Sequence, residues 1–273
     1  PSRFLVGPDR LKRHYTTRLV RRSIRKLARP PILWIANVHR AHLLEQIPAS
    51  LKISDAIDDW ESISVYRQLG QRIRSGYDTV MEHADVIYTV SRQLEKKFQE
   101  RAKTPHVRHL PNGVDPNLFH LPAEPPSVRK GARKDRRPVL TYVGVLSERV
   151  DLNLIERISQ DWPQCGFQLV GPMSRAAEQK WTEMQRIPNL QWKGLVHHSK
   201  IPDILRSSDV LLIPHMDSPL SQSMDPLKLY EYLTTGLPIV STPVPPTEEY
   251  PSLVRIGTGQ RFSEQIGAAL DEV

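Results

Sequence analysis

The segment at residues 225–242, DPLKLYEYLTTGLPIVST, places a cation and a carboxylate three residues apart. Lys228 and Glu231 share one face if this segment is helical. An ammonium near the first turn of a helix, where backbone N–H groups have no intrahelical acceptor, stabilises a phosphate. A carboxylate one turn later can accept hydrogen bonds from hydroxyl groups such as those of a ribose. The spacing by itself favours a simpler interpretation, a capped surface helix that carries an ion pair.

The same segment contains signals for the start and the end of a helix. Asp225 is a favoured N-cap residue, and Pro226 is a favoured first helical residue. Gly236 permits a left-handed turn after the helix, and Pro238 prevents the helix from continuing. We therefore predict a helix that is capped by the Asp225 side chain, has free amides near Leu227, and is followed by a buried strand.

The composition indicates a globular protein of two modest domains, because 273 residues with 39% hydrophobic content can form two cores. No apolar run approaches the roughly 18 to 20 residues that cross a bilayer. A lone Cys165 excludes an internal disulfide, and no signal-peptide pattern opens the chain, which favours a reducing, cytoplasmic location. The chain starts at Pro1 rather than at Met, so we expect further sequence upstream.

Residues 10–29 carry nine positive charges and no acidic residue, whereas the net charge of the whole chain is +8. Apolar residues recur at helical spacing in this segment, which predicts a basic amphipathic helix whose apolar stripe packs on a sheet. An anionic membrane surface is the favoured partner of the cationic face and would hold the protein at the inner face of the cell membrane. Nucleic acid is disfavoured, because no aromatic interleaving or nucleic-acid motif accompanies the charge. The cations are Arg10, Lys12, Arg13, Arg18, Arg21, Arg22, Arg25, Lys26 and Arg29.

Short β-type runs alternate with helical patterns through both halves of the chain, which predicts an α/β fold with parallel sheets covered by helices. A proline-rich, basic stretch without periodicity separates the halves and is typical of a linker. We therefore expect an N-terminal domain at residues 1–120, a linker at 121–137 and a C-terminal domain at 138–273. The predicted strands are Phe4–Val6, Ile32–Ala36, Leu51–Ile57, Asp85–Val90, His106–Leu110, Val139–Val143, Phe167–Val170, Leu190–Trp192, Val210–Ile213 and Pro238–Ser241.

Three regions resemble one protein family, in the order that the family has them. The first is EHADVIYTVSRQLEKKF with LPNGVDPNLF, the second is LTYVGVLSERVDLNLIERI, and the third joins NLQWKGLVHHSKIPDILRSSDVLLIP to DPLKLYEYLTTGLPIVST. Together they resemble the GT-B glycosyltransferases, in particular the large retaining family that uses nucleotide-sugar donors (family 4-like, group 1). The resemblance implies two Rossmann-like domains that face each other across a cleft, with the donor held by the C-terminal domain.

The resemblance also implies roles for residues of the C-terminal domain. When a sugar leaves a nucleoside diphosphate, negative charge grows on the departing phosphate, and fixed cations and free amides stabilise it. By match to the family, the diphosphate would contact Gly144, Arg149, Leu227 and Lys228, the ribose would contact Glu231, and the base would face Gly194, Leu195 and Val196.

The chain departs from the family pattern at two of these places. Val145 stands where the family commonly has an arginine, and Ser223 stands where it has the first of two paired glutamates. These changes affect one phosphate contact and the contacts to the donor sugar. His197 and His198 are interpreted as loop residues and not as metal ligands, because no third ligand has a recognisable spacing.

In the N-terminal domain, the sequence IDDW at residues 57–60 ends a predicted strand where many relatives have a His-Asp pair near the reacting sugar. An Asp at the carboxyl end of a parallel strand faces the crevice where ligands of such sheets bind. Asp58 and Asp59 are therefore candidate catalytic residues, and Asp58 would orient a sugar hydroxyl or accept a proton from the acceptor. His39, which follows the preceding strand, is a third candidate.

The resemblance leads us to expect a metal-independent, hexosyltransferase-type enzyme with a nucleotide-diphosphate sugar as co-substrate and no other cofactor. It would transfer the sugar, with retention, to a polysaccharide or lipid-linked acceptor. Two alternatives stay open: a nucleotide-sugar epimerase on the same fold, and an inactive homologue that binds nucleotide or membrane only. Asp55, Asp58 and Asp59 would also suit a metal-dependent transferase of another fold, whose activity a chelator would abolish.

The N-terminal domain lacks its opening strands and the acceptor-side glycine loop when it is compared with the family pattern. The chain also stops within RFSEQIGAALDEV, where relatives continue with further helices. We therefore expect a fragment or a shortened homologue.

Overall fold

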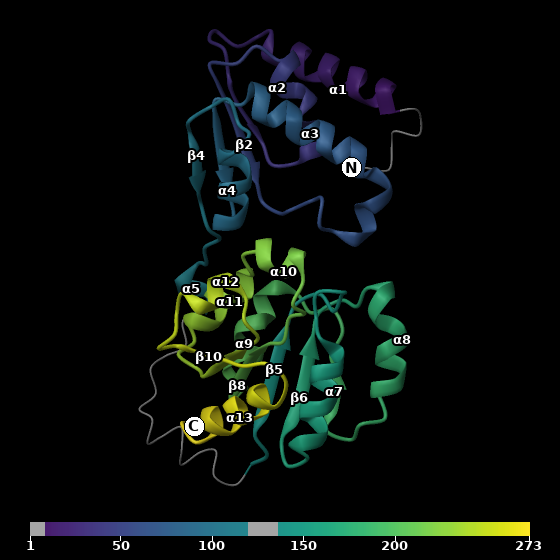
Figure 1. Cartoon of the computed structure of the whole chain (residues 1–273), viewed down its shortest axis with the longest axis vertical. Helices are drawn as coiled ribbons and strands as arrows, with labels where there is room; N and C mark the ends of the chain where they lie inside the picture. Colours follow the sequence, from purple (N-terminus) through teal and green to yellow (C-terminus); the bar gives the residue numbers. More distant parts are fainter. Residues whose placement is uncertain (1–8, 120–135) are drawn as a thin grey trace. The chain divides into compact units, whose positions relative to one another are not determined.

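The chain forms two compact units, residues 1–111 and 112–273, in a computed structural model that describes residues 9–119 and 136–273 (Figure 1). Each unit contains one sheet whose paired strands are all parallel. The predicted α/β class with two Rossmann-like units is therefore confirmed. Within the described residues, no helix combines the length and the apolar character that crossing a membrane requires.

The first unit has a four-stranded sheet in the order β1-β2-β3-β4, and its core lies between this sheet and the helices that connect the strands. Each connection returns the chain from the carboxyl end of one strand to the amino end of the next, as parallel pairing requires. The strands are β1 (Ile32–Ile35), β2 (Leu51–Ala56), β3 (Val86–Thr89) and β4 (Val107–His109), and the helices are α1 (Asp9–Ile24), η2 (Val38–Arg40), α2 (His42–Gln46), η3 (Ser64–Leu69), α3 (Gly70–His83) and α4 (Arg92–Gln99).

The second unit has a six-stranded sheet in the order β10-β9-β8-β5-β6-β7. The strands are β5 (Val139–Val143), β6 (Gly166–Val170), β7 (Leu190–Trp192), β8 (Val210–Ile213), β9 (Ile239–Ser241) and β10 (Val254–Ile256). The helices are α5 (Pro116–Phe119), α7 (Leu152–Asp161), α8 (Arg175–Met184), η4 (His198–Lys200), α9 (Ile201–Arg206), α10 (Pro219–Ser223), α11 (Leu227–Leu233), α12 (Pro245–Glu248) and α13 (Gly259–Leu270).

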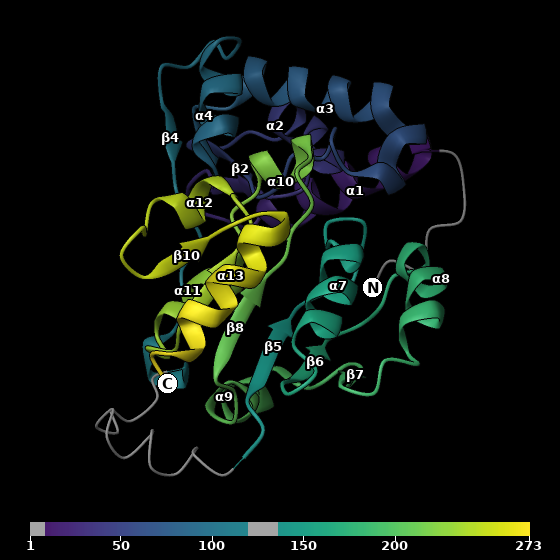
Figure 2. The ribbon, with the colours of Figure 1, turned by 60° about the horizontal axis from the view of Figure 1, so that its bottom comes forward.

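Helices cover both faces of the six-stranded sheet, as Figure 2 lets the reader follow. One core cluster joins the sheet to α7, α8 and α13, and a second joins the opposite face to α9 and α11. The strand β8 lies near the middle of the sheet, and all four of its residues are buried. This double burial explains its continuous apolar sequence, which a half-exposed strand would not have.

The boundary between the units lies between Pro111 and Asn112, earlier than the predicted domain end at residue 120. The helix α5 contacts α11, and the buried Phe119 belongs to a core cluster of the second unit. Most of the predicted linker and the predicted strand Phe4–Val6 lie outside the described residues. Arg136, near the end of the predicted linker, donates a hydrogen bond to the buried Asp209 at 2.9 Å and so belongs to the second unit.

The predicted packing of the apolar stripe of residues 10–29 is confirmed only for Val20 and Ile24, which lie against the core of the first unit. Leu11, Tyr15 and Leu19 are 63%, 50% and 46% exposed, and only part of the stripe lies against the core of the first unit. Two hydrogen bonds fix this rotation of the helix: Thr17 Oγ1 lies 2.7 Å from Gln46 Oε1, and Arg40 donates to Thr16 Oγ1 at 2.9 Å. These polar contacts turn Thr16 and Thr17 inward, so the outer apolar residues face away from the core.

Candidate functional site

Three glycines follow the carboxyl ends of three neighbouring strands of the second unit. Gly144 follows β5, Gly171 follows β6, and Gly194 lies just after β7, and all have positive φ angles, of 148°, 134° and 71°. A Cβ at Gly171 would lie 2.2 Å from the carbonyl oxygen of Gly144, and no side chain can be accommodated at that distance. The loops after β5 and β6 therefore pack backbone against backbone at the carboxyl ends of the strands, where ligands of such sheets bind.

The loop after β5 is held by the loops that follow β6 and β8. Leu146 donates its N–H to Pro172 O at 2.9 Å, and Met216 donates its N–H to Arg149 O at 2.8 Å. Asp151 N–H donates to Pro214 O at 2.8 Å, and the Asp151 side chain then caps α7 through Leu154 N–H at 2.9 Å. The half-buried Arg149 thus starts from a fixed backbone at the same edge as the glycines.

The helix α11 places Lys228 against Gly144. Tyr232 of this helix accepts a hydrogen bond from the N–H of Val143, at the end of β5, at 2.8 Å. A Cβ at Gly144 would lie 2.9 Å from Lys228 Cε and 3.1 Å from its Nζ, so a side chain at this position would displace the lysine. Lys228 Nζ also lies 3.3 Å from Nε2 of His215. Among the described residues, no carboxylate forms an ion pair with Lys228.

The surroundings of Lys228 disfavour its charged form. Burial, together with the positive charge of Arg149, lowers the pKa of Lys228 to about 7, although Glu231 acts in the opposite direction. Burial, with Lys228 and Arg149, also lowers the pKa of His215 well below its ordinary value. His215 is 2% exposed, and its Nδ1 has no hydrogen-bond partner among the described residues. Lys228, His215 and Arg149 therefore lie close enough to disfavour one another's positive charge, and an anion beside them would be stabilised.

Glu231 lies one turn after Lys228 on the same helix and is 6% exposed. Its Oε1 lies 3.2 Å from Nε2 of His198, whose side chain is 60% exposed. The ring of Phe119 packs edge-on against His198, with 5.4 Å between the ring centroids. The interpretation of His198 as a loop residue is wrong, since His198 is the first residue of η4, which follows the loop after β7. Its contact with Glu231 depends on the tertiary structure.

Gly194, Leu195 and Val196, the predicted base-binding residues, precede His198 in this loop. Leu195 is 79% exposed, and a Cβ at Gly194 would meet no atom within 4 Å. Val196 packs against the core cluster that contains Leu229 and Tyr232 of α11. Gly194 O accepts a hydrogen bond from Gly171 N–H at 2.8 Å, so only Leu195 of the three is exposed. Their contact with a base stays a prediction.

The predicted N-cap at Asp225 is wrong. The helix α11 begins at Leu227, and its N-cap is Pro226, which makes no side-chain capping bond. The Asp225 carboxylate instead accepts hydrogen bonds from Asn112 N–H at 2.6 Å and from Tyr230 Oη at 2.8 Å. Asn112 returns a bond from its Nδ2 to Asp225 O at 2.7 Å. Asn112 thus holds Asp225 ahead of α11, and the Asp225 side chain does not cap the helix because it binds this distant residue. Gly236 does adopt the predicted left-handed conformation, with φ of 64°.

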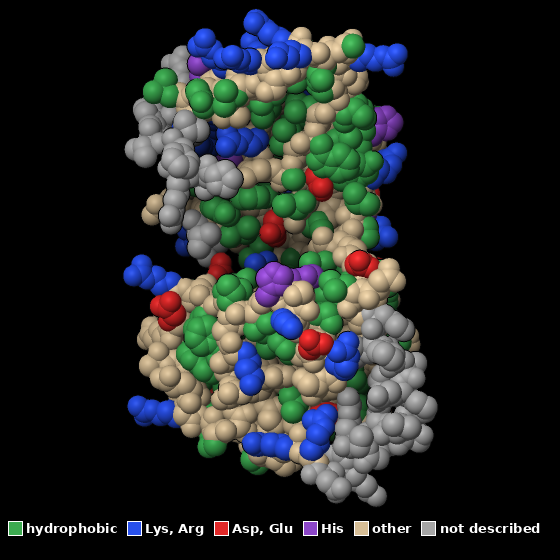
Figure 3. Space-filling view, turned by 180° about the vertical axis from the view of Figure 1, so that it is seen from behind, with side chains coloured by type: hydrophobic (Ala, Val, Ile, Leu, Met, Phe, Trp, Pro, Cys, Tyr) green, Lys and Arg blue, Asp and Glu red, His purple; other side chains and the backbone are tan. Residues whose placement is uncertain are grey.

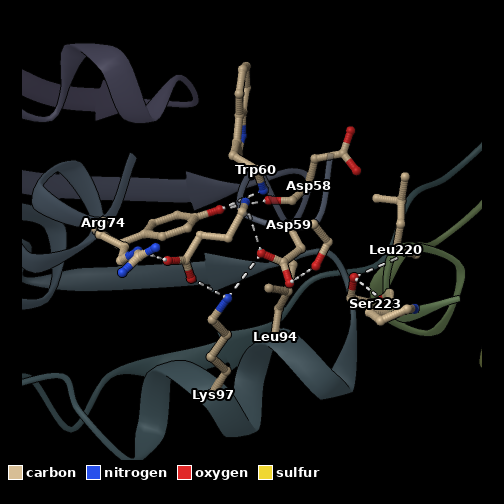
Figure 4. Close-up of polar contacts among 12 residues, drawn as sticks. Asp58, Asp59, Trp60, Arg74, Leu94, Lys97, Leu220 and Ser223 are labelled. Atoms are coloured by element: carbon tan, nitrogen blue, oxygen red, sulfur yellow. Dashed lines mark hydrogen bonds and ion pairs between the residues drawn. The ribbon is translucent and has the colours of Figure 1, made fainter. Parts of the chain in front are cut away.

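In the first unit, the Asp59 carboxylate contacts its own loop and Lys97 (Figure 4). Its carboxylate lies 3.0 Å from Lys97 Nζ and accepts a hydrogen bond from Ser62 Oγ at 3.0 Å. Lys97 Nζ also lies 2.8 Å from Glu61 Oε2, so one lysine joins two carboxylates. Asp59 is 7% exposed. These contacts support a structural role for Asp59, and its catalytic role stays a prediction.

Asp58 and His39 have different surroundings. The Asp58 carboxylate points away from Lys97 in Figure 4, while its backbone carbonyl accepts a hydrogen bond from Tyr77 Oη at 3.1 Å. His39 lies in η2, after β1, and packs edge-on against Trp60 with 5.6 Å between the ring centroids. The structure therefore brings His39 to the IDDW loop. Burial, with Arg13 and Arg40, lowers the pKa of His39.

The second unit matches a model of protein families over residues 137–272, under the description "Glycosyl transferases group 1". By this unit, the chain belongs to the group 1 glycosyl transferases. The sites of the resemblance, the glycine loop after β5 and the lysine and glutamate of α11, all lie within the matched residues. No group of three His, Cys, Asp or Glu side chains in the described part of the chain is placed to hold a metal ion.

One curated relative of this group 1 chain is TuaH of Bacillus subtilis (strain 168), a glycosyltransferase by name, assigned to teichuronic acid biosynthesis. It is 28% identical over 179 residues, which are 65% of this chain and 45% of TuaH. The match thus spans less than half of the length of that relative.

Solved structures of similar fold include a sucrose-phosphate synthase from Thermosynechococcus elongatus, with a TM-score of 0.76 and 16% identity over 99% of this chain and 72% of that one. HepE of Anabaena in complex with UDP has a TM-score of 0.70 and 15% identity over 94% of this chain and 72% of that one. An E. coli structure described as trehalose-6-phosphate bound with UDP-2-fluoro glucose has a TM-score of 0.66 and 14% identity over 95% and 69% of the chains. At these identities the likeness concerns the fold.

Proposed function

We propose that this protein is a glycosyltransferase that takes a sugar from a nucleoside diphosphate sugar. The observation that carries the proposal is Lys228, a half-buried lysine held beside Gly144 with no ion-pair partner among the described residues. An unpaired charge in such a place is costly unless a ligand supplies the opposite charge. A diphosphate supplies it, and its charge grows as the sugar departs, so the lysine stabilises the transition state more than the bound donor.

The donor would extend across the carboxyl ends of the strands in the second unit. We assign the diphosphate to the Gly144 loop, Arg149, Lys228 and the amide of Leu227. Glu231 would accept hydrogen bonds from the ribose, and His198, 3.2 Å away, would orient its carboxylate. The base would lie on the loop of residues 194–196. UDP is the first nucleotide to test, since HepE was solved with UDP and glucose.

Transfer would proceed with retention and without a metal ion, as the resemblance implies. A hexose is the expected sugar, and Asp58 and His39 of the first unit are the candidate groups at the reacting sugar. The name of TuaH points to a cell-surface polysaccharide or its lipid-linked precursor as the acceptor. An epimerase on the same fold has no support among these relatives.

The enzyme would work at an anionic membrane on the cytoplasmic side. Figure 3 shows Lys and Arg side chains gathered at the end of the first unit that α1 forms. The exposed Leu11, Tyr15 and Leu19 recur every four residues along α1, beside these cations. Apolar residues next to basic ones on one helix are typical of helices that lie in the surface of an anionic bilayer.

The test measures the binding of the donor and the transfer of its sugar in two variants that each lose one cation. UDP and other nucleoside diphosphates would be screened by thermal shift, and transfer from the selected UDP-sugar would be followed with a radiolabelled sugar and a bacterial lipid extract. At UDP concentrations near the wild-type Kd, we expect Lys228→Met to remove the stabilisation and to abolish transfer. Arg186→Met, which removes an exposed cation of the same unit, should leave both unchanged. Donor stabilisation that survives Lys228→Met would contradict the proposed site.

A second candidate function is a homologue that binds the nucleotide without transferring a sugar. Ser223, at the place of the family's first glutamate, is 2% exposed and donates its hydroxyl to Pro219 O at 2.9 Å within α10. A serine in this position has no carboxylate to offer a donor sugar. Calorimetric binding of UDP with no transfer from any UDP-sugar to the lipid extract would favour this function over the enzyme.

A further inference from the structure

Two neighbouring cavities border α1 in the first unit. The larger, the arginine pocket, has a volume of about 830 Å³ and is lined by Arg18, Arg21, Arg22 and Arg25, with His14 and Gln46. The smaller, the apolar groove, has a volume of about 480 Å³ and is lined mainly by Ile24, Leu27, Pro30, Pro31 and Pro48. Arg21 and Arg25 border both cavities, so a polar and an apolar compartment meet there.

The arginine pocket carries positive charge that no described acidic residue balances. Arg18, Arg21 and Arg22 are spaced so that they share one face of α1, and Arg25 directly follows its last residue. Arg21 is oriented by the protein, since its Nη2 donates to Gln46 O at 2.8 Å. No described Asp or Glu forms an ion pair with Arg18, Arg22 or Arg25, and all three are exposed. The pocket therefore attracts an anion of more than one charge, and guanidinium groups bind phosphate in a bidentate way.

The apolar groove lies at the amino ends of the strands. Pro30 and Pro31 directly precede β1, and Pro48 shortly precedes β2. Asp58 and Asp59 follow the carboxyl end of β2, so the two cavities lie at the opposite edge of this sheet from the candidate catalytic residues. A ligand here would be held away from those residues, as an anchor and not as the reacting group.

We propose that these cavities bind one molecule of an anionic lipid that ends in a phosphomonoester, with the phosphate in the arginine pocket and a hydrocarbon chain along the apolar groove. The proposal rests on the proposed function in that the lipid would hold the same enzyme at its membrane. A diffuse basic surface needs only net charge, whereas four arginines around one pocket favour a phosphate with nearly two charges. The apolar groove beside the pocket would bury the apolar surface of a hydrocarbon chain, and a free phosphate has no such surface.

The test compares vesicles of equal surface charge. One set contains phosphatidylcholine with about 10% phosphatidic acid, and the other contains phosphatidylcholine with about 20% phosphatidylglycerol, so that the surface charges are about equal. We expect the full chain to sediment with the phosphatidic acid vesicles at least about tenfold more tightly, because the pocket recognises the monoester. Equal binding to both sets would overturn the proposal, since it would show attraction to net charge alone.

Two double variants of equal charge separate the pocket from the rest of the helix. Arg22→Ala with Arg25→Ala removes two exposed pocket residues, and we expect it to weaken binding to phosphatidic acid vesicles roughly thirtyfold and to abolish the preference. Lys12→Ala with Lys26→Ala removes two cations that line neither cavity, and should weaken both vesicle sets alike while the preference remains. A preference that survives the arginine variant would overturn the assignment.

Two further measurements distinguish the sources of phosphate and the two proposals. Leu27→Ser in the apolar groove should weaken vesicle binding but not the binding of soluble glycerol 1-phosphate. Tight binding of glycerol 1-phosphate without recruitment to vesicles would overturn the lipid assignment. Stabilisation by UDP should be unchanged in all of these variants, because the donor site is in the other unit. Failure of the wild type to bind UDP would count against the proposed function. It would not affect the conclusion about lipid binding, which is tested separately.

Discussion

Two cationic regions of this protein, the surroundings of Lys228 and the arginine pocket, differ in how far their charges are exposed to solvent. Lys228 is half-buried, oriented by Gly144 and His215, and has a pKa lowered to about 7. The four arginines of the arginine pocket are exposed, and Arg21 among them is oriented by its hydrogen bond to Gln46 O. A desolvated site gains anion affinity from few charges because the effective dielectric constant is low. An exposed site gains it from many charges and is screened by salt.

The sharpest way to test this contrast is to remove one charge from each region. We expect Lys228→Met to lower the affinity for UDP about a hundredfold, or about 3 kcal/mol, because a buried charge-assisted contact is lost. Arg22→Ala alone should lower the affinity for phosphatidic acid vesicles only about fivefold, since each cation near the surface contributes about 1 kcal/mol. Isothermal titration with UDP and vesicle sedimentation give the two numbers. Equal losses would contradict the difference in burial.

The pH dependence separates lysine from arginine. Because the pKa of Lys228 is about 7 in the free site, the lysine loses its proton as the pH rises above 7, and donor binding must restore it. We expect the affinity for UDP-glucose, whose diphosphate does not titrate in this range, to fall about tenfold between about pH 6 and pH 8. Vesicle binding should not fall with it, because guanidinium groups keep their charge. Titration in buffers of different ionisation enthalpy would detect the proton uptake, and its absence would show an ordinary lysine.

Added salt should weaken vesicle binding more than it weakens UDP binding. Raising the ionic strength from about 0.05 M to about 0.2 M should weaken vesicle binding about tenfold, because the exposed arginines lie within reach of screening ions. The affinity for UDP should change less than about threefold over the same range, since the half-buried lysine is screened less. A steep salt dependence of UDP binding would place the donor phosphate on exposed residues instead of Lys228.

The smallest effect concerns stability. The lowered pKa of Lys228 means that the charged lysine is unfavourable in the folded chain below pH 7, and that this cost is relieved between about pH 7 and the unfolded value of about 10.4. Lys228→Met should therefore stabilise the second unit by about 1 kcal/mol at pH 7, or about 2 to 4 °C in melting temperature. Arg22→Ala should leave the melting temperature unchanged. Calorimetric scans of both variants would decide this.

The patterns of the sequence are sufficient for the local structure. Alternating β and helical runs predict nine of the strands at their observed places, from Ile32 to Ser241, because apolar periodicity is a property of neighbouring residues. β10 (Val254–Ile256), a strand at the edge of the sheet, is not predicted. Gly236 is predicted to be left-handed and is so, because a steric requirement at one residue needs no distant partner.

The candidate site is only partly predicted. The helical spacing of Lys228 and Glu231 puts both residues on one helix, which the structure bears out. The partners of these residues are not visible in the sequence. His198 contacts Glu231 from 33 positions away, and His215 contacts Lys228 from 13 positions away. The two histidines carry no spacing signal, so only a search for titratable residues at strand ends could have singled out His215, which follows β8.

The sequence by itself determined the α/β order of elements, the glycine positions and the charge of residues 10–29, because these depend on residue types and on spacing along the chain. The tertiary structure decided which groups meet. It drew Asp225 away from its helix to Asn112, 113 positions apart, and it turned Leu11, Tyr15 and Leu19 of α1 outward. Competing partners for one carboxylate, or one rotation of a helix, differ in free energy through contacts that exist only after the chain has folded.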